Sequence, residues 1–224
     1  MPLSTPGAQN PLILPIARSD GLPCAVRMPW TGGPGVDART AVRAIFLDRD
    51  GVINENRRDH VKEWSEFRFL PGAIEAVARL SRAGIAVFVI TNQAIVNRGL
   101  VSRHTVDAIN ARMAGEIARQ GGRIEAIAYC PHRPDEECAC RKPRPGLLLE
   151  LARRYRLDLS RAVMVGDALT DIDAGLAAGC QAILVLTGRG SEELARARTA
   201  GRNGFRVAAD LNGVADLVLG NTLC

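Results

Sequence analysis

From residue 42 onward, short apolar runs alternate with longer segments in which apolar residues recur every three or four positions. Continuous apolar runs predict strands buried on both faces, at 42–47, 85–90, 124–129, 162–165 and 182–186. Apolar stripes predict helices at 72–83, 102–120, 145–155 and 171–178, with a weaker helix, strand and helix after them. The alternation predicts an α/β fold, a Rossmann-like parallel sheet flanked by helices on both faces.

Residues 1–40 have a different pattern. Proline, glycine, serine and threonine recur there, and neither the period of a helix nor that of a strand persists. We expect a flexible leader over 1–40, followed by one domain over 41–220. Met28 is an alternative start of translation, and the sequence leaves that choice open.

Composition narrows the class of protein. Of the 224 residues 47% are apolar, which supports a folded domain, and the net charge of +5 comes from interspersed acids and bases. Aromatic residues make up 4% and no basic run alternates with them, so we expect no nucleic-acid partner. No apolar run approaches the roughly 20 residues that span a membrane, and the first residues do not match a signal peptide. We therefore expect a cytoplasmic monomer.

Polar residues follow the predicted strands. Asp48 and Asp50 follow the first strand, Thr91 and Asn92 the second, and Asp167 the fourth. Because parallel strands end at one edge of a sheet, these groups should converge. Two carboxylates one residue apart can face one cation or substrate, and Mg²⁺ would favour keeping both ionised. A solvated turn or a helix cap is the ordinary alternative for each motif, so the convergence carries the hypothesis.

Four potential ligands for a soft metal stand within eleven residues: Cys130, His132, Cys138 and Cys140. Thiolates and an imidazole form a set suited to tetrahedral Zn²⁺. Because four protein ligands leave no open position for substrate, such a zinc would be structural. The alternatives are a Cys138–Cys140 disulfide or reduced surface thiols. We interpret His60 and His104 as solvated or capping residues.

Arg141 and Lys142 follow the last of these cysteines directly. Lys62 and Lys142 are the only lysines among 29 basic residues, so a compact ammonium at position 142 indicates a specific use, such as neutralising phosphate charge. A surface basic pair is the ordinary alternative. Asp171, four residues after Asp167, is expected to hold Lys142 or to cap a helix.

In this order the motifs resemble those of the haloacid dehalogenase superfamily of phosphatases: Asp48-x-Asp50-Gly51-Val52, then Thr91, then Lys142, then Gly166-Asp167 with Asp171. The cysteine and histidine insertion that ends in Arg141-Lys142-Pro143 resembles that of the phosphatases of heptose bisphosphates and histidinol phosphate. The resemblance covers about residues 43–218. It implies a fold without a large cap domain, so that loops form the pocket.

The resemblance also implies roles for single residues. Asp48 would be the nucleophile that forms an aspartyl phosphate, and Asp50 would act as acid and then as base. Mg²⁺ would be held by the side chains of Asp48 and Asp167 and by the main-chain carbonyl of Asp50, and the phosphoryl group by Thr91 and Lys142. The residues expected near a small phosphorylated sugar are Asn92, Gln93, Arg98 and Arg141.

The chain departs from the family pattern around the pocket. Asp59-His60-Val61 stands where Gly-Tyr-Val is usual, and Ala168 stands where a lysine is common. These departures leave the substrate open: the 7-phosphate of a heptose bisphosphate comes first, and histidinol phosphate or another small monoester is the alternative. A catalytically silent, zinc-stabilised binding domain is the rival from another class.

Overall fold

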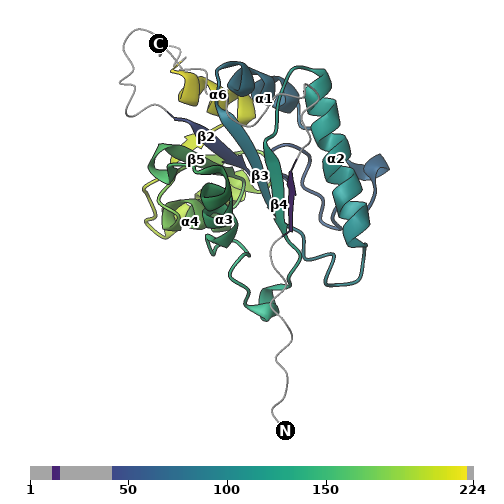
Figure 1. Cartoon of the computed structure of the whole chain (residues 1–224). Coiled ribbons are helices and arrows are strands. Elements are labelled where there is room, and N and C mark those ends of the chain that lie inside the picture. The colour runs from purple at the N-terminus through teal and green to yellow at the C-terminus, as the bar shows by residue number, and fades with distance from the viewer. Residues whose placement is uncertain (1–11, 16–41, 221–224) are drawn as a thin grey trace.

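The computed structural model describes residues 12–15 and 42–220 (Figure 1). The strands are β1 (Leu12–Pro15), β2 (Ala44–Leu47), β3 (Ala86–Asn92), β4 (Ala126–Cys130), β5 (Ala162–Gly166), β6 (Gln181–Val185) and β7 (Arg206–Ala208). The α-helices are α1 (Ala73–Arg82), α2 (Arg103–Arg119), α3 (Gly146–Tyr155), α4 (Leu169–Ala177), α5 (Gly190–Thr199) and α6 (Leu211–Leu219). Short 3₁₀ helices span Trp64–Glu66, Pro134–Glu136 and Leu159–Arg161. Every strand and helix predicted from the apolar pattern is present.

The strands form one sheet in the order β1-β4-β3-β2-β5-β6-β7. All neighbours from β4 to β7 pair in parallel, whereas β1 pairs with β4 in the antiparallel sense. The predicted parallel sheet is therefore confirmed for six strands, and β1 makes the complete sheet mixed. The chain order reverses at β2, because β3 lies on one side of it and β5 on the other. Ligands of such sheets bind at that switch point, beyond the carboxyl ends of the strands.

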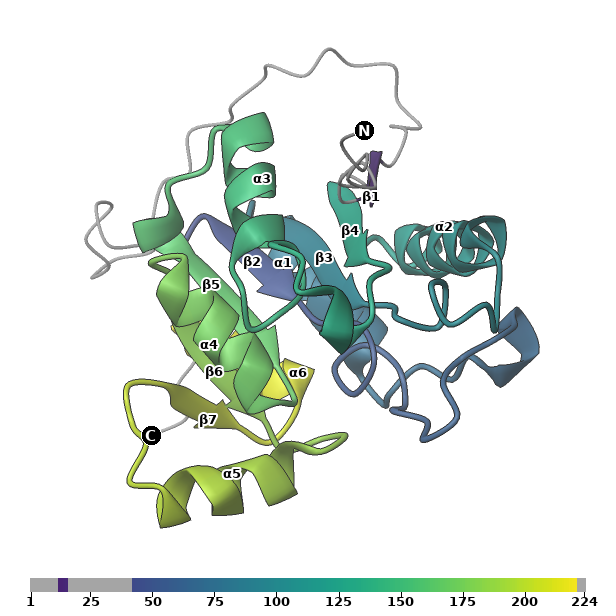
Figure 2. The same ribbon diagram turned by 90° about the horizontal axis from the view of Figure 1, so that it is seen from below.

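The side chains of β2 alternate between two hydrophobic cores. Ile45 and Leu47 belong to the core shared with α1, α2 and α6, whereas Ala44 and Phe46 belong to the core shared with α3 and Ala174 of α4. Figures 1 and 2 show these two groups of helices on opposite faces of the sheet. A strand covered on both faces appears in the sequence as a continuous apolar run, which is why the pattern predicted the central strands.

Strand β1 lies inside the stretch expected to be a flexible leader. Its residues pair with β4 from Leu12 opposite Tyr129 to Pro15 opposite Ala126. The sequence did not predict this strand, because the segment is short, carries proline and depends on a partner far along the chain. The rest of the expected leader lies outside the described residues.

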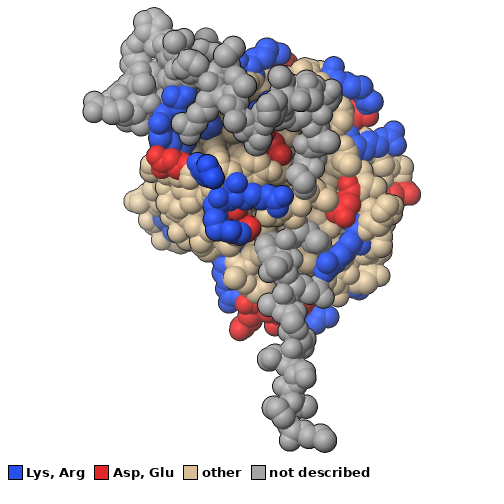
Figure 3. Space-filling view, viewed as in Figure 1, with Lys and Arg blue, Asp and Glu red and all other residues tan. Residues whose placement is uncertain are grey.

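The surface gives two further observations. Within the described residues, no helix combines the length and apolar character needed to cross a bilayer. On the face seen in Figure 3, lysine and arginine side chains form small groups with acidic side chains between them.

Candidate active site

A pocket of about 620 Å³ opens beyond the carboxyl ends of the central strands. Its walls include Asp48 and Asp50 after β2, Thr91 and Asn92 at the end of β3, and Lys142 in the loop before α3. These side chains come from distant parts of the sequence, and the parallel sheet brings them together as the position of the strand ends predicted. The arrangement places acids, a lysine and a hydroxyl around one cavity.

Lys142 lies buried between two carboxylates. Its Nζ is 2.8 Å from Asp48 Oδ1 and 2.7 Å from Asp171 Oδ1, and it donates to the carbonyl oxygen of Ile90 at 2.9 Å. Burial alone would lower the pKa of Lys142, but the charges of Asp171 and Asp48 outweigh it and raise the pKa. The other carboxyl oxygen of Asp171 accepts from the backbone N–H of Ala168 at 3.1 Å. Asp171 therefore fulfils both expected uses, because it holds Lys142 and accepts a hydrogen bond from the backbone N–H of the residue that precedes α4.

Asp48 is a buried carboxylate paired with a lysine. Its Oδ1 forms the ion pair with Lys142, 2.8 Å from Nζ. Burial raises the pKa of Asp48 to about 6; Lys142 opposes the rise, and Asp171 and Asp50 add to it. A buried carboxylate with a raised pKa, paired with a lysine at the wall of a pocket, fits a nucleophilic or metal-binding role.

Three carboxylates offer oxygens within 4.8 Å of one another: Asp48, Asp167 and Asp171. All three carboxylates have partners among the described residues, so the choice of Asp48 and Asp167 as the pair that could hold a cation stays the expectation from the family resemblance. Hard carboxylate oxygens of this kind suit Mg²⁺.

Two glycines make room for Asp167. A Cβ at Gly51 or at Gly188 would lie 2.2 Å from Asp167 Oδ2, and both glycines have positive φ, +91° and +56°. The same oxygen accepts from the backbone N–H of Arg189 at 2.9 Å and from Asn56 Nδ2 at 3.2 Å. The backbone at Gly51 and Gly188 thus approaches the Asp167 carboxylate more closely than a residue with a Cβ could.

The side chain of Asp50 faces the pocket but lies outside the group of three carboxylates. Arg49 Nη2 donates to its two oxygens at 3.1 and 2.9 Å, Asn54 Nδ2 to one at 2.9 Å and Gln93 Nε2 to the other at 2.8 Å. Burial raises the pKa of Asp50, but Arg49 and the hydrogen bonds from Asn54 and Gln93 outweigh it, so the pKa lies below its ordinary value. The structure therefore places both aspartate side chains at one pocket, as expected for a shared substrate, while the carboxylate of Asp50 is not part of the group of three that could share a cation.

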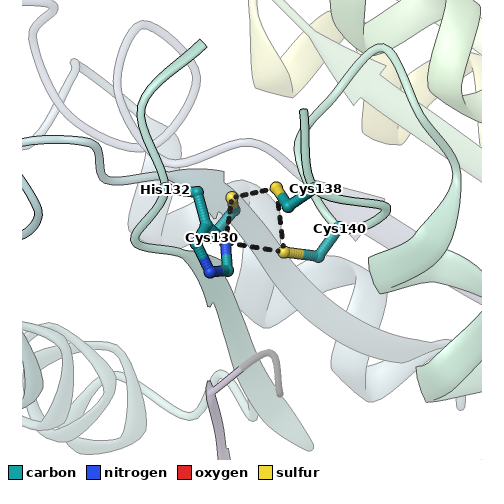
Figure 4. A group of neighbouring side chains, drawn as sticks. All are labelled: Cys130, His132, Cys138 and Cys140. Atoms are coloured by element: carbon teal, nitrogen blue, oxygen red, sulfur yellow. Dashed lines mark hydrogen bonds between the residues drawn. The ribbon is translucent and has the colours of Figure 1, made fainter. Parts of the chain in front are cut away.

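The predicted zinc ligands form a tight cluster beside this pocket (Figure 4). Cys130 Sγ lies 3.4 Å from His132 Nδ1 and 3.5 Å from Cys138 Sγ, and Cys140 Sγ lies 3.3 Å from His132 Nδ1 and 3.4 Å from Cys138 Sγ. The three cysteines are free, so the Cys138–Cys140 disulfide is excluded. Tetrahedral zinc with bonds of about 2.0–2.3 Å separates its ligand atoms by about 3.5–3.8 Å, close to these distances. The donor set and the spacing both fit zinc.

The residues expected near substrate divide into two groups. Arg141 lines the pocket and donates to the carbonyl oxygen of His132 at 3.2 Å, which ties the cysteine loop to the pocket wall. Asn92 also lines it, and its amide bonds to the backbone N–H and C=O of Lys142. By contrast, Gln93 bonds Asp50 and Thr91, and the exposed Arg98 is not part of the described pocket wall. Gln93 and Arg98 are thus not among the residues that line the pocket, and their contact with substrate stays a prediction.

Sequence reasoning missed part of the basic wall. Arg57, Arg58 and His60 line the pocket from the loop after Asp50, and Arg189 lines it after β6. His60, interpreted from the sequence as solvated or capping, is partly exposed and lies in the wall of the pocket. Asp48 and Asp167 directly follow their strands, whereas Arg189 stands four residues after the end of β6, so the position after a strand gave no comparable signal for it.

A parallel α/β sheet whose carboxyl edge gathers buried carboxylates and a lysine around one pocket fits a hydrolase. A family model described as "HAD-hyrolase-like" matches residues 139–214. The D-glycero-beta-D-manno-heptose-1,7-bisphosphate 7-phosphatase of Bordetella bronchiseptica is 44% identical over 178 residues, which cover 80% of this chain and 98% of that protein. The enzyme of the same name from Pseudomonas aeruginosa is 43% identical over 78% of this chain and 97% of its own length. The chain belongs to the haloacid dehalogenase-like hydrolases.

Solved structures agree with this assignment. The crystal structure of D,D-heptose 1,7-bisphosphate phosphatase from B. bronchiseptica, complexed with magnesium and phosphate, is 43% identical, with a TM-score of 0.76 over 81% of this chain and all of that one. The corresponding enzyme from Burkholderia thailandensis is 36% identical, with a TM-score of 0.60 over 77% of this chain and 96% of that one.

Proposed function

We propose that this protein is a magnesium-dependent phosphatase that hydrolyses the 7-phosphate of D-glycero-D-manno-heptose 1,7-bisphosphate. The observation that carries the proposal is Lys142, buried between Asp48 and Asp171 at the wall of the pocket. A lysine in this position neutralises phosphate charge beside the carboxylate that attacks phosphorus. The names of the similar enzymes supply the substrate.

The reaction would proceed in two displacements. Asp48 attacks phosphorus and the bond from phosphorus to the sugar oxygen breaks. Asp50, which must first take up a proton because Arg49 and its hydrogen bonds hold its pKa low, gives that proton to the sugar oxygen. Water then attacks the aspartyl phosphate and passes a proton to Asp50, which releases phosphate and restores the Asp48 carboxylate. Thr91 and Lys142 bind the phosphoryl oxygens during both displacements. Asp48, Asp167 and the main-chain carbonyl of Asp50 would hold Mg²⁺, which neutralises phosphoryl charge when bound.

The basic wall favours a bisphosphate over histidinol phosphate. Besides Lys142, the pocket is lined by Arg57, Arg58, Arg141 and Arg189. Arg57 pairs with Asp59 and Arg189 with Asp167, so Arg58 and Arg141 are the candidates for another anionic group, and guanidinium groups suit phosphate oxygens. Arg141, fastened to the cysteine loop through His132, is our candidate for contact with the distal phosphate.

We further propose that Cys130, His132, Cys138 and Cys140 bind a structural zinc ion. Zinc would fix the loop that carries Arg141 and Lys142, and its binding free energy would contribute to folding. A reducing compartment keeps such thiols available, so we place the enzyme in the cytoplasm. We also propose that it acts as a monomer.

The test compares rates of phosphate release from heptose 1,7-bisphosphate, histidinol phosphate and para-nitrophenyl phosphate, with and without Mg²⁺. The heptose bisphosphate should give the highest kcat/KM, and Asp48→Asn should remove activity on all three. Equal rates for wild type and Asp48→Asn would refute the phosphatase and favour a silent binding domain. A preference for histidinol phosphate would refute the substrate alone.

A further inference from the structure

Arg49 is a charged side chain in the protein interior. It stands between Asp48 and Asp50 in the sequence, and its side chain is 1% exposed. Its Nε has no hydrogen-bond partner among the described residues. Burial of a guanidinium group carries a desolvation cost of several kcal/mol, and an unpaired N–H adds to it. Hydrophobic residues would fill this space at lower cost, so stability does not explain the arginine.

The contacts of Arg49 join Asp50 to a distant helix. Nη2 spans both oxygens of Asp50, at 3.1 and 2.9 Å, and Nη1 donates to Asn110 Oδ1 at 3.0 Å. Asn110 lies on α2, fully buried among the apolar residues Ile109, Met113 and Ala114 of that helix. A polar residue on an apolar stripe needs a reason, and the hydrogen bond to Arg49 is the one that the structure offers.

We propose that Arg49 and Asn110 are positioning residues for Asp50. The inference rests on the proposed function, in which Asp50 moves protons to the leaving oxygen and from water. A planar guanidinium group that spans both carboxylate oxygens fixes the plane of the carboxylate, and Asn110 fixes the guanidinium group in turn. Proton transfer requires such orientation, because the carboxyl group must reach the departing oxygen within hydrogen-bond distance.

Two substrates with different leaving groups can distinguish a positioning role from a general loss of structure. A sugar alkoxide is a strong base, so its departure requires a proton from Asp50. A para-nitrophenolate ion is stable without that proton, so formation of the aspartyl phosphate from the aryl ester does not depend on Asp50. Since kcat/KM reports only the steps up to departure of the leaving group, the ratio of the two kcat/KM values measures the positioning of Asp50.

The experiment measures kcat/KM for heptose 1,7-bisphosphate and for para-nitrophenyl phosphate at saturating Mg²⁺, in wild type, Asn110→Ala and Arg49→Lys. General acid catalysis contributes about 10²–10⁴ in rate, so loss of its positioning should lower the sugar-phosphate value about 10- to 100-fold and the aryl value by less than about threefold. Asn110→Asp, which keeps the acceptor for Arg49, should recover most of the loss. Met113→Leu, a core change on the same helix, should leave the ratio unchanged.

A parallel fall on both substrates, or an unchanged ratio in the folded variants, would overturn the positioning role. If Asn110→Ala does not fold, Asn110→Ser is judged by the same ratio. An inactive wild type would instead remove the proposed function, whereas an active wild type with an unchanged ratio removes only this inference.

Discussion

Asp48 carries a charge that the fold holds at a cost, so Asp48→Asn should stabilise the protein in the absence of Mg²⁺. The buried carboxyl has a pKa of about 6 against an ordinary 3.8. At about 1.36 kcal/mol per pH unit, this difference corresponds to about 3 kcal/mol at pH 7.5. The substitution leaves Lys142 with Asp171 and the carbonyl oxygen of Ile90, and the amide oxygen of the asparagine can still accept from it. We therefore expect a gain in the free energy of unfolding of about 1–3 kcal/mol.

The gain should depend on pH with a definite sign. Because the folded carboxyl binds its proton more tightly than the unfolded one, wild type loses stability as the pH rises from about 4 through 6, and the loss is complete above that range. The advantage of Asp48→Asn should therefore be greatest near pH 7.5 and should vanish near pH 4. Mg²⁺ should reverse the order, because it binds and stabilises the wild-type carboxylate.

Urea denaturation of both proteins in magnesium-free buffer, at intervals from pH 4.5 to 7.5, measures the difference directly. A titration of Mg²⁺ at pH 7.5 completes the assay. A variant less stable than wild type at pH 7.5 without Mg²⁺, or a difference that does not change with pH, would refute the reasoning.

Further predictions concern the metal sites and the pocket wall. Gly188→Ala should abolish activity and stabilisation by Mg²⁺, because a Cβ would lie 2.2 Å from Asp167 Oδ2; a normal Mg²⁺ titration would contradict this. Cys138→Ser should lower the Tm and reduce the zinc content from about one per chain, measured by elemental analysis, and an unchanged Tm would count against a structural zinc. Arg141→Ala should raise KM for the heptose bisphosphate about tenfold or more while leaving KM for para-nitrophenyl phosphate within about twofold; equal changes would argue against contact with the distal phosphate. Asp171→Asn should lower kcat about 10- to 100-fold, since Lys142 loses one of its two carboxylates, and full activity would exclude that role.

The sequence predicted the features that depend on burial and on strand ends. The strand 85–90 is covered on both faces, so its apolar run was unambiguous, and Asp48, Thr91 and Asp167 reached one edge because parallel strands end together. The directions of single side chains could not be predicted in this way. Asp50 turns toward Arg49, and Gln93 turns toward Asp50, because of contacts made only in the folded chain.

The positions of loop residues were even harder to predict from the sequence. His60 and Arg189 line the pocket from irregular segments. The conformation of such segments cannot be predicted from the periodicity of apolar residues. Arg98, on a turn after β3, lies exposed although it is close in sequence to Thr91. Family resemblance identified the chemistry, whereas the wall of the pocket depends on how these loops fold.

The pairing of β1 with β4 has a consequence for the solubility of the protein. Strand β4 is entirely buried, and β1 supplies the hydrogen-bond partners along its outer side. A chain begun at Met28 would lack β1 and would present the backbone groups of β4 as an open edge. Open edges recruit strands from other molecules, so the shorter chain should self-associate while keeping its catalytic residues. In the full chain the sheet instead ends on Leu12–Pro15, a four-residue strand that closes with proline, and short edge strands with proline resist such pairing.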